Sequence, residues 1–279
     1  MRCKQFTDFI HAHTLGVDPH SIHIDKLMTR ELVEKSGFKS PKVLFQVDTI
    51  HDVDFEKLPD TLVLKLTNQA SKRGVFILHK VANGFYEQLS EKIFTQEEIV
   101  RRFDSLHTSK TKVIGEKLIF GENGAYEIPY DYKLYTFESG VQLVFQVNRN
   151  PKKDEVAFFD GDFVPITDQR VRAGPKKFVS KGNPVRPKNY AEMLAVARRL
   201  LKELDRPFVS VDLYTTGEEV YVGELTPTPG ASYVGNIFRF SEQFDAQLGQ
   251  LMTEGYEKRN WAIPEFDEPS PIRKKRSKS

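Results

Sequence analysis

Two carboxylates, Asp212 and Glu224, bracket a predicted β-hairpin in the segment VSVDLYTTGEEVYVGELTPTPG. Both acids stand among residues that are suited to burial, and a buried carboxylate is costly unless it is paired or binds a cation. Hard divalent ions prefer such oxygens, and Mg²⁺ typically takes one or two carboxylates together with substrate phosphates. The pair therefore indicates a metal site, and two acids on exposed faces of the hairpin are the alternative.

The register of this hairpin decides whether the two acids meet. A two-residue turn at Thr216-Gly217 would leave Glu224 facing away from Asp212, because side chains alternate between the faces of a sheet. A three-residue loop would pair Asp212 with Val222 and Ser210 with Glu224, and both acids would share one face. Metal binding by this pair therefore requires an odd-length loop, or a bulge that shifts one strand by a residue.

Lys65 lies inside a short apolar strand pattern, LVLKL, directly before a polar loop, TNQASKRG, that contains Lys72, Arg73 and Gly74. A strand lysine that leads into a loop of backbone amides and cations can grip phosphate oxygens, because the strand fixes one charge while the loop closes over the ligand. The segment thus predicts a phosphate site. An edge-strand lysine with solvated neighbours is the alternative.

Two further signals are weaker. Glu116-Lys117 separates the apolar triplets VIG and LIF, which suits a connecting strand whose backbone meets a purine edge, although an exposed pair on an amphipathic strand explains it as well. Four histidines crowd the start of the chain and raise the question of a zinc site, which the lack of a cysteine partner and of helical spacing disfavours. They are His11, His13, His20 and His23.

Helices and strands must hold these residues in place. The sequence patterns typical of helices and those typical of strands follow one another along the chain without strict alternation. Strand runs interspersed with helices, without strict alternation, argue for an α+β fold with mostly antiparallel sheets. We expect helices over residues 29–36, 97–106, 187–204 and 240–252, and strands over 43–47, 62–66, 75–78, 113–120, 131–137, 143–148, 208–214 and 220–226.

Composition narrows the class of protein. The chain has 279 residues, with 41 Lys and Arg against 39 Asp and Glu, so nucleic acid is not the expected partner. Its apolar runs are too short for an integral membrane segment. Cys3 has no second cysteine to bridge, and the start MRCKQFTDFI lacks the pattern of a cleaved signal, so we expect a cytoplasmic protein. The final segment, PEFDEPSPIRKKRSKS, reads as a disordered basic tail, and weak contact with an anionic surface is its alternative role.

Taken in order, these segments resemble the ATP-grasp superfamily, in particular its TupA-like branch, which is found in polysaccharide biosynthesis. The resemblance runs from about Asp25 to Leu251. IDKLMTRELVEKSGFKSPKVL resembles the family's opening Asp-Lys and helix, LPDTLVLKLTNQASKRGVFI its phosphate-gripping lysine and loop, and VIGEKLI its hinge over adenine. DYKLYTF resembles the central strand, and the hairpin of Asp212 and Glu224 resembles the metal-binding hairpin.

The resemblance implies two α+β subdomains that grip ATP between them, without a full Rossmann-like first domain, because too few residues precede Lys26. We accordingly expect four parts. They are an N-terminal helical segment over 1–42, a lid subdomain over 43–119, a core subdomain with the metal site over 120–262, and the basic tail over 263–279.

The same resemblance assigns residues to ATP and Mg²⁺. Lysines would bind the phosphates, residues 67–74 would form the lid, residues 116–118 would meet the adenine, and two acids would hold the metal. The implied ATP-binding residues are Lys26, Lys65, Ser71, Lys72, Arg73, Gly74, Glu116, Lys117, Leu118 and Lys133, and the implied Mg²⁺ ligands are Asp212 and Glu224.

Two positions depart from the family pattern. Ser210 stands where an arginine usually precedes the metal aspartate, so the cation that stabilises the transferred phosphoryl group must come from elsewhere. We expect Arg149 to replace it, reaching across from the neighbouring strand toward the γ-phosphate, and to act in catalysis with Lys65. Thr226 stands where many ligases of the superfamily carry Asn, which would weaken a second metal site.

Family members couple ATP cleavage to the joining of a carboxylate and an amine through an acylphosphate. The resemblance therefore implies a carboxylate-amine ligase that joins an amino acid or amine to a sugar acid or a cell-surface polysaccharide precursor. A kinase that phosphorylates a hydroxyl is one alternative. A nucleotide-binding protein with weakened catalysis is another, and Ser210 is the residue that favours it.

Overall fold

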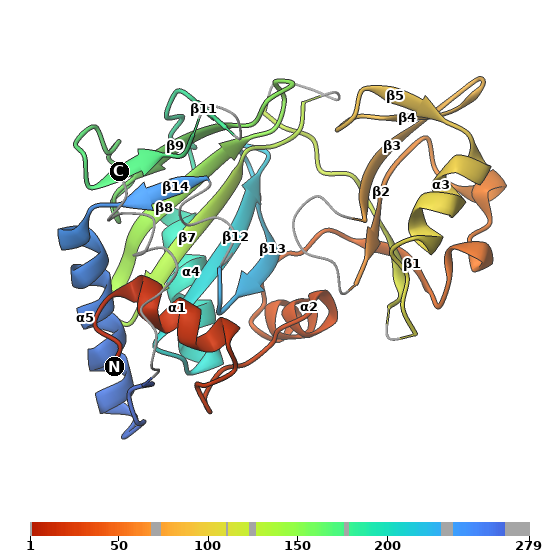
Figure 1. Cartoon of the computed structure of the whole chain (residues 1–279). Coiled ribbons are helices and arrows are strands. Elements are labelled where there is room, and N and C mark those ends of the chain that lie inside the picture. The colour runs from red at the N-terminus through yellow and green to blue at the C-terminus, as the bar shows by residue number, and fades with distance from the viewer. Residues whose placement is uncertain are drawn as a thin grey trace.

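The computed structural model describes residues 2–67, 74–109, 111–122, 127–175, 179–229 and 237–265. These residues form two six-stranded sheets and a two-stranded ribbon. The two large sheets stand side by side, and helix α2 (Lys26–Lys35) lies below the region between them (Figure 1). The fold is α+β with mostly antiparallel pairing, as the sequence predicts.

The first sheet has the strand order β1-β6-β2-β3-β4-β5, and each neighbouring pair is antiparallel. In β2 the residues Leu62, Leu64 and Leu66 point to a core that helix α3 covers, whereas Val63 and Lys65 take the opposite face. The strands are β1 (Val43–Val47), β2 (Thr61–Leu66), β3 (Val75–Val81), β4 (Gly84–Glu87), β5 (Lys92–Phe94) and β6 (Val113–Glu116). Helix α3 (Gln96–Asp104) follows β5, and short 3₁₀ turns η1 (Ile50–Asp52) and η2 (Phe55–Lys57) precede β2.

The second sheet has the order β11-β9-β8-β7-β12-β13 and is antiparallel except for the β11–β9 pair. Alternation along β12 sends Val209, Val211 and Leu213 into one core, while Ser210 and Asp212 take the other face. The strands are β7 (Asp131–Phe137), β8 (Gly140–Asn148), β9 (Glu155–Phe159), β11 (Ser180–Lys181), β12 (Phe208–Thr215) and β13 (Val220–Thr226).

Helices cover both faces of this second sheet. On one face α4 (Tyr190–Leu204) and α2 bury the side chains that alternate away from the polar residues. On the other face α1 (Phe6–Thr14), α5 (Glu242–Lys258) and the ribbon of β10 (Val171–Ala173) with β14 (Phe238–Phe240) pack over one end of the sheet. Helices α1 and α5 lie side by side at that end (Figure 1). The remaining part of this face is left to the polar residues of β7, β12 and β13.

Helix α2 begins three residues earlier than the sequence predicts, because Asp25 caps it. The Asp25 carboxylate accepts hydrogen bonds from the backbone N–H groups of Leu27 (2.8 Å) and Met28 (2.9 Å). Lys26 therefore occupies the first turn of the helix, and the backbone N–H of Leu225 donates to the Thr29 hydroxyl (3.3 Å), which ties α2 to β13.

The predicted tail begins too early. Ile263 packs into the core beneath α1 and α5, and the backbone N–H of Cys3 donates to the carbonyl of Pro264 (3.1 Å). An isolated bridge joins Arg2 to Glu265. Residues 263–265 thus belong to the packed body, because an apolar side chain and backbone pairing hold them there, and the basic residues of the predicted tail lie outside the described ranges. None of the helices in the described part of the chain combines the length and hydropathy needed to cross a bilayer.

Candidate active site

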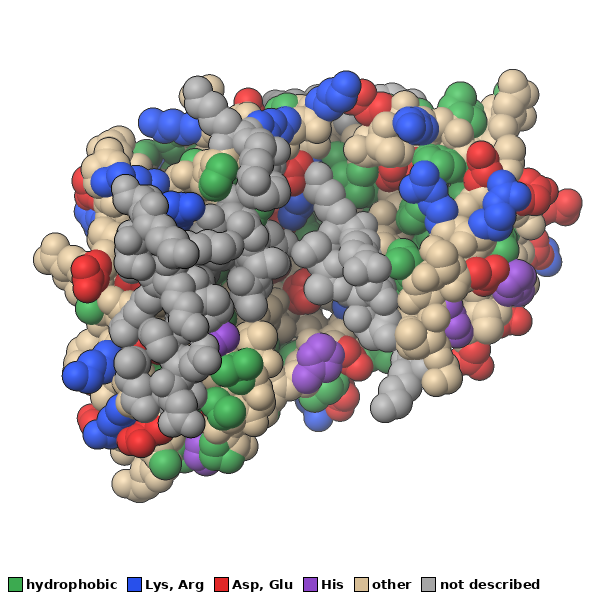
Figure 2. Space-filling view, in the orientation of Figure 1, with side chains coloured by type: hydrophobic (Ala, Val, Ile, Leu, Met, Phe, Trp, Pro, Cys, Tyr) green, Lys and Arg blue, Asp and Glu red, His purple; other side chains and the backbone are tan. Residues whose placement is uncertain are grey.

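A cavity of about 320 Å³ opens between the two sheets, and residues from both sheets and from α2 line it. It gathers most of the residues that the sequence singles out, from widely separated parts of the chain. They are Lys26, Lys65, Glu116, Lys117, Leu118, Lys133, Arg149, Asp212 and Glu224. Acidic and basic side chains are interspersed over the rest of the face shown in Figure 2.

Asp212 and Glu224 sit directly opposite each other on β12 and β13. Neither of the two predicted loop lengths is present, because the connection covers the four residues 216–219. The register is instead shifted by a bulge, the second route that the sequence analysis allows: Leu213 pairs with Val222, whereas Asp212 pairs with Glu224, and Gly223 is the extra residue. The bulge turns both carboxylates into the cavity.

Glycine is required at this bulge because an aromatic ring closes over it. A Cβ atom on Gly223 would lie 2.4 Å from the Tyr214 ring, a distance that real Cβ contacts do not reach. The small residue thus lets β13 pass under Tyr214 with the shifted register that brings the two acids together.

We therefore expect Gly223→Ala to separate the acids as well as to destabilise the fold, since the ring or the strand must move. The variant should melt at a lower temperature, as overpacking typically costs about 1–3 kcal/mol, and Mg²⁺-dependent nucleotide binding should weaken. Gly255→Ala on α5 is the matched control, because its Cβ would lie 2.6 Å from Pro207, far from the cavity. Calorimetric binding of AMP-PNP with Mg²⁺ checks this, and equal affinity in the two variants would contradict it.

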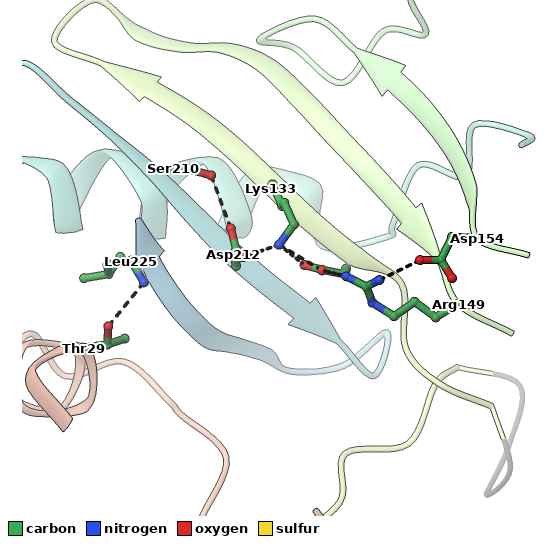
Figure 3. Close-up of polar contacts among 8 residues, drawn as sticks. Thr29, Lys133, Arg149, Asp154, Ser210, Asp212 and Leu225 are labelled. Carbon is green, nitrogen blue, oxygen red and sulfur yellow. Dashed lines mark hydrogen bonds and ion pairs between the residues drawn. The ribbon is translucent and has the colours of Figure 1, made fainter. Parts of the chain in front are cut away.

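A chain of ion pairs crosses the floor of the cavity (Figure 3). The Lys133 ammonium contacts the carboxylate of Asp212 and that of Asp131 (3.0 Å). Asp131 also accepts from the Arg149 guanidinium (2.9 Å), whose other nitrogen donates to Asp154 (3.0 Å). The chain links the predicted metal acid to the predicted catalytic arginine through two intervening side chains.

The two buried aspartates of this chain differ in their acidity. Burial raises the pKa of the Asp212 carboxyl to about 7, and the nearby carboxylates of Asp131 and Glu224 add to the rise, against the pull of the Lys133 ammonium. Burial also acts to raise the pKa of Asp131, but Lys133 and Arg149 outweigh it and hold that pKa below its usual range. The directions follow the number of adjacent cations, because Asp131 contacts two of them whereas Asp212 contacts Lys133 alone.

A second cationic group lies on the opposite wall. Lys65 forms an ion pair with the buried Glu116 carboxylate (2.5 Å), which also accepts from Arg30 of α2 (3.2 Å). Burial lowers the pKa of the Lys26 ammonium, and the neighbouring charge of Lys65 lowers it further, while Glu224 and Glu116 oppose this. Both lysines therefore face the cavity with carboxylates at hand that a phosphate group could replace.

An apolar wall lies next to Glu116. Val63, Ile77, Leu118 and Ile128 form a small buried cluster, and all four line the cavity. The strand that carries Glu116 ends there, and the backbone N–H of Lys117 donates to the Lys42 carbonyl (2.8 Å). The predicted strand over 113–120 is thus too long, because the chain leaves the sheet at the point where it meets this wall. The apolar cluster beside an irregular backbone segment is suited to a flat heteroaromatic ring.

The predicted lid is described at its two ends. Ser71, Lys72 and Arg73 lie outside the described residues. Gly74 is in the left-handed region (φ +65°), and its carbonyl accepts from the backbone N–H of Leu66 (2.9 Å), so it closes the β2–β3 connection. It lines a separate hollow with Phe76 and Glu87 and does not face the cavity between the sheets.

The histidines of the N-terminal segment make other contacts. His13 packs against Asp18 (2.5 Å) and the Tyr256 hydroxyl (2.8 Å), and His20 stacks on Trp261 with ring centroids 4.1 Å apart. These contacts fasten the segment after α1 to the end of α5. Within the described residues, no group of three or more His, Cys, Asp or Glu side chains is arranged to hold a metal.

The donors at the β12–β13 hairpin fit Mg²⁺ when phosphate oxygens complete the coordination. Asp212 and Glu224 supply hard carboxylate oxygens from facing positions, and Asp212 already contacts a cation, the Lys133 ammonium. Ser210 lies on the same face, with its hydroxyl 3.3 Å from Asp212, and adds no charge.

Sequence reasoning missed Asp131 and placed Arg149 too close to the acids. Arg149 follows β8, and β7 separates that strand from β12, so Arg149 does not reach over from a neighbouring strand. Asp131 stands between them, two residues before Lys133 and on the same face of β7. The signal was the Asp-x-Lys spacing at the start of an apolar strand, which puts opposite charges on one face.

Comparisons with known proteins show the family and the fold of the chain. A family model described as TupA-like ATPgrasp matches residues 12–253. The structure of a D-alanine–D-alanine ligase from Bacillus anthracis complexed with ATP is similar, with a TM-score of 0.50 at 14% identity over 92% of this chain and 75% of that chain. A second structure of the ligase from that organism gives a TM-score of 0.51 at 14% identity over 99% and 78% of the two chains. The likeness shows an ATP-grasp-like fold, and no curated protein sequence matches the chain.

Proposed function

This chain belongs to the TupA-like ATP-grasp family, and from that premise we propose that it is an ATP- and Mg²⁺-dependent carboxylate-amine ligase. The observation that carries the proposal is the composition of the cavity between the sheets. An apolar wall, lysines from α2 and from both sheets, a facing pair of acids and an arginine line it together. This set of side chains is suited to a nucleoside triphosphate whose phosphates point toward the acids.

In this proposal ATP lies with its base against Leu118 and the apolar wall. Lys26 and Lys65 contact its phosphates, because a phosphate group can replace Glu116 as the partner of Lys65. Ser71, Lys72 and Arg73 are proposed to bind the phosphates as well. Asp212 and Glu224 would hold Mg²⁺, which supplies neutralisation of charge on the phosphate oxygens.

The residues of the chain then serve two steps. In the first, a substrate carboxylate oxygen attacks the γ-phosphorus, the bond from that phosphorus to the bridging oxygen breaks, and ADP leaves with the electron pair. Lys133 and Arg149 stabilise the negative charge that spreads over the transferred group. In the second, an amine attacks the acyl carbon, the bond to the phosphate oxygen breaks, inorganic phosphate leaves, and the nitrogen releases a proton.

Phosphorylation is needed because a carboxylate repels nucleophiles at neutral pH and lacks a leaving group. We propose a sugar acid or a polysaccharide precursor as the acid and an amino acid or amine as its partner, in keeping with the branch of the family, and the cytoplasm as the place of reaction, where ATP is supplied.

The direct experiment incubates the protein with ATP, Mg²⁺ and a panel of uronic acids and amino acids. Phosphate release and the mass of the product are measured. We expect ADP and phosphate in equal amounts with a product whose mass is that of acid plus amine minus water. A product that gains a phosphoryl group without free phosphate would show a kinase, and ATP binding without consumption under any pairing would favour a nucleotide-binding protein.

Lys65→Ala should weaken ATP binding by about tenfold or more, since one charge-assisted contact is typically worth about 1.5–3 kcal/mol. The matched control is Lys80→Ala on β3, an exposed lysine that donates to the Glu56 carbonyl on the same subdomain. Isothermal calorimetry measures both, with circular dichroism to check the fold. Unchanged ATP affinity in a folded Lys65→Ala variant would remove Lys65 from the site.

A further inference from the structure

We infer that Asp131 is a positioning residue for the γ-phosphate of ATP: its buried carboxylate holds the Lys133 ammonium and the Arg149 guanidinium together in the cleft, and keeps Lys133 there when Asp212 is committed to Mg²⁺. This inference rests on the proposed function and names a residue that neither the family resemblance nor the sequence reasoning assigns a role.

The geometry places Asp131 at the junction of the two cations. One of its oxygens lies 3.0 Å from Lys133 and 2.9 Å from Arg149, and its other oxygen accepts from Lys133 at 3.3 Å. Asp131 is 3% exposed and lines the cavity. Asp131, fixed on β7, therefore holds two positive charges in one region of the cleft, which is what a phosphate with several oxygens requires.

Lys133 is shared between two carboxylates with different tasks. It contacts Asp131 within β7 and Asp212 across the strand pair, where Lys133 and Asp212 face each other. If Asp212 binds Mg²⁺, its ion pair with Lys133 must loosen, because a divalent ion and an ammonium would compete for the same oxygens. Asp131 then retains the ammonium beside Arg149, so Lys133 is freed from the metal acid without leaving the cleft.

A purely structural ion pair is the competing explanation. Buried ion pairs often contribute little net stability compared with apolar side chains of the same volume, because their desolvation costs about as much as the attraction returns. Asp131, Lys133 and Arg149 all line the cavity, whereas the neighbouring Tyr132 and Leu134 on the other face pack into an apolar core. The charges thus gather on the face that the nucleotide is proposed to occupy.

The test compares AMP-PNP with ADP, both with Mg²⁺, by calorimetry on Asp131→Asn. The two nucleotides differ in the terminal phosphate group, so the ratio of their affinities reports contacts to that group. We expect the wild-type chain to bind AMP-PNP more tightly than ADP. In Asp131→Asn the ratio of the two affinities should fall about tenfold while the affinity for ADP is largely kept, since one charge-assisted contact to the terminal phosphate is misplaced. Half-maximal binding of AMP-PNP should also need more Mg²⁺ in this variant, because Lys133 then pairs with Asp212 and competes with the metal for its carboxylate.

Simple charge removal predicts the opposite sign. Loss of a negative charge near the phosphates would tighten both nucleotides, so tighter AMP-PNP binding, or an equal loss for both nucleotides, would overturn the inference. Asp154→Asn is the matched control, because Asp154 holds Arg149 but is paired with it from the far side of the guanidinium. It should reduce the preference less, and a reduction equal to that of Asp131→Asn would also overturn it.

Two further results keep this test decisive. If Asp131→Asn does not fold, Asp131→Glu keeps the charge but moves the carboxylate, and the same loss of AMP-PNP preference is expected. A wild-type chain that binds neither nucleotide would contradict the proposed function itself. If the wild-type chain prefers AMP-PNP and both Asp131 variants keep the same preference, the result contradicts the role of Asp131 alone.

Discussion

Asp212→Asn and Glu224→Gln are each expected to lower turnover by about a hundredfold or more, because each removes one of the two facing carboxylates that would hold Mg²⁺ against the phosphates. Release of ADP with the acid and amine found in the panel measures this. The requirement for Mg²⁺ should rise in both variants, since the remaining acid binds a hard cation more weakly on its own.

Stability should change in the opposite sense to activity in Asp212→Asn. The pKa of Asp212 is raised in the folded chain, so its ionised form at neutral pH is less favourable in the folded state than in the unfolded state. A neutral amide removes that cost, while Asp131 still pairs with Lys133. The melting temperature without metal should therefore be unchanged or higher.

Glu219→Gln is the matched control for these two variants. Glu219 lies in the loop of the same hairpin, where it forms an ion pair with Lys39 and accepts a hydrogen bond from the Tyr221 hydroxyl. Its side chain is 41% exposed. It should leave turnover and the Mg²⁺ requirement unchanged. Full activity in Glu224→Gln would remove the hairpin from the site.

Arg149→Gln should be the second severe lesion, with turnover reduced by about a hundredfold or more and ADP affinity largely kept. The reason is that Ser210 offers no charge beside Asp212, whereas Arg149 lines the cavity. In the proposed reaction its guanidinium would stabilise the charge of the transferred group in the transition state. Single-turnover measurement of ADP formation separates this chemical step from nucleotide binding.

Arg149→Lys should recover only part of the loss. An ammonium keeps the charge but cannot bridge Asp131 and Asp154 as the guanidinium does. Arg170→Gln is the control, an arginine of the same subdomain whose ion pair is with Asp168. A wild-type rate in Arg149→Gln would assign the missing positive charge to another residue, of which Lys133 is the nearest in this chain of ion pairs.

Local pattern predicts much of this fold. The apolar run LVLKL predicts a strand, and the structure confirms it as β2, with Lys65 on the face opposite Leu64 and Leu66. Helix α1 lies in the segment that is expected to be helical, but its bounds are not predicted, because FTDFIHAHT is short and rich in residues of modest helix propensity. Its stability comes from packing, since Phe6 and Phe9 are fully buried against residues that lie far along the chain.

The apolar positions of the hairpin contain the information that sets its register. Val220, Val222 and Leu225 all enter one core, and the step of three between the last two requires one residue to be bulged out of the alternation. The Thr216-Gly217 signal suggested a shorter turn, but the backbone N–H of Thr216 bonds to the Glu219 carbonyl (3.2 Å) and closes a longer loop.

The chain of ion pairs could be predicted only in part. The Asp-x-Lys spacing puts Asp131 and Lys133 on one face of a strand, which is local information. That Arg149 meets Asp131 depends on the antiparallel pairing of β7 with β8, where Asp131 lies opposite Val147, and this is set by tertiary structure. Sequence reasoning therefore identified Lys133, Arg149 and Asp212 individually but not Asp131 or Asp154, and the sheet order determines which of these side chains touch.

The central claim is that a carboxylate is activated by phosphorylation, and oxygen-18 transfer tests it most directly. The acid identified in the panel is prepared with ¹⁸O in both carboxylate oxygens and incubated with ATP, Mg²⁺ and the amine, and the released phosphate is analysed by mass spectrometry. The ligase mechanism predicts that each phosphate carries one ¹⁸O from the acid and that the amide product retains the other. Phosphate without label, or label kept entirely in the acid portion of the product, would contradict it.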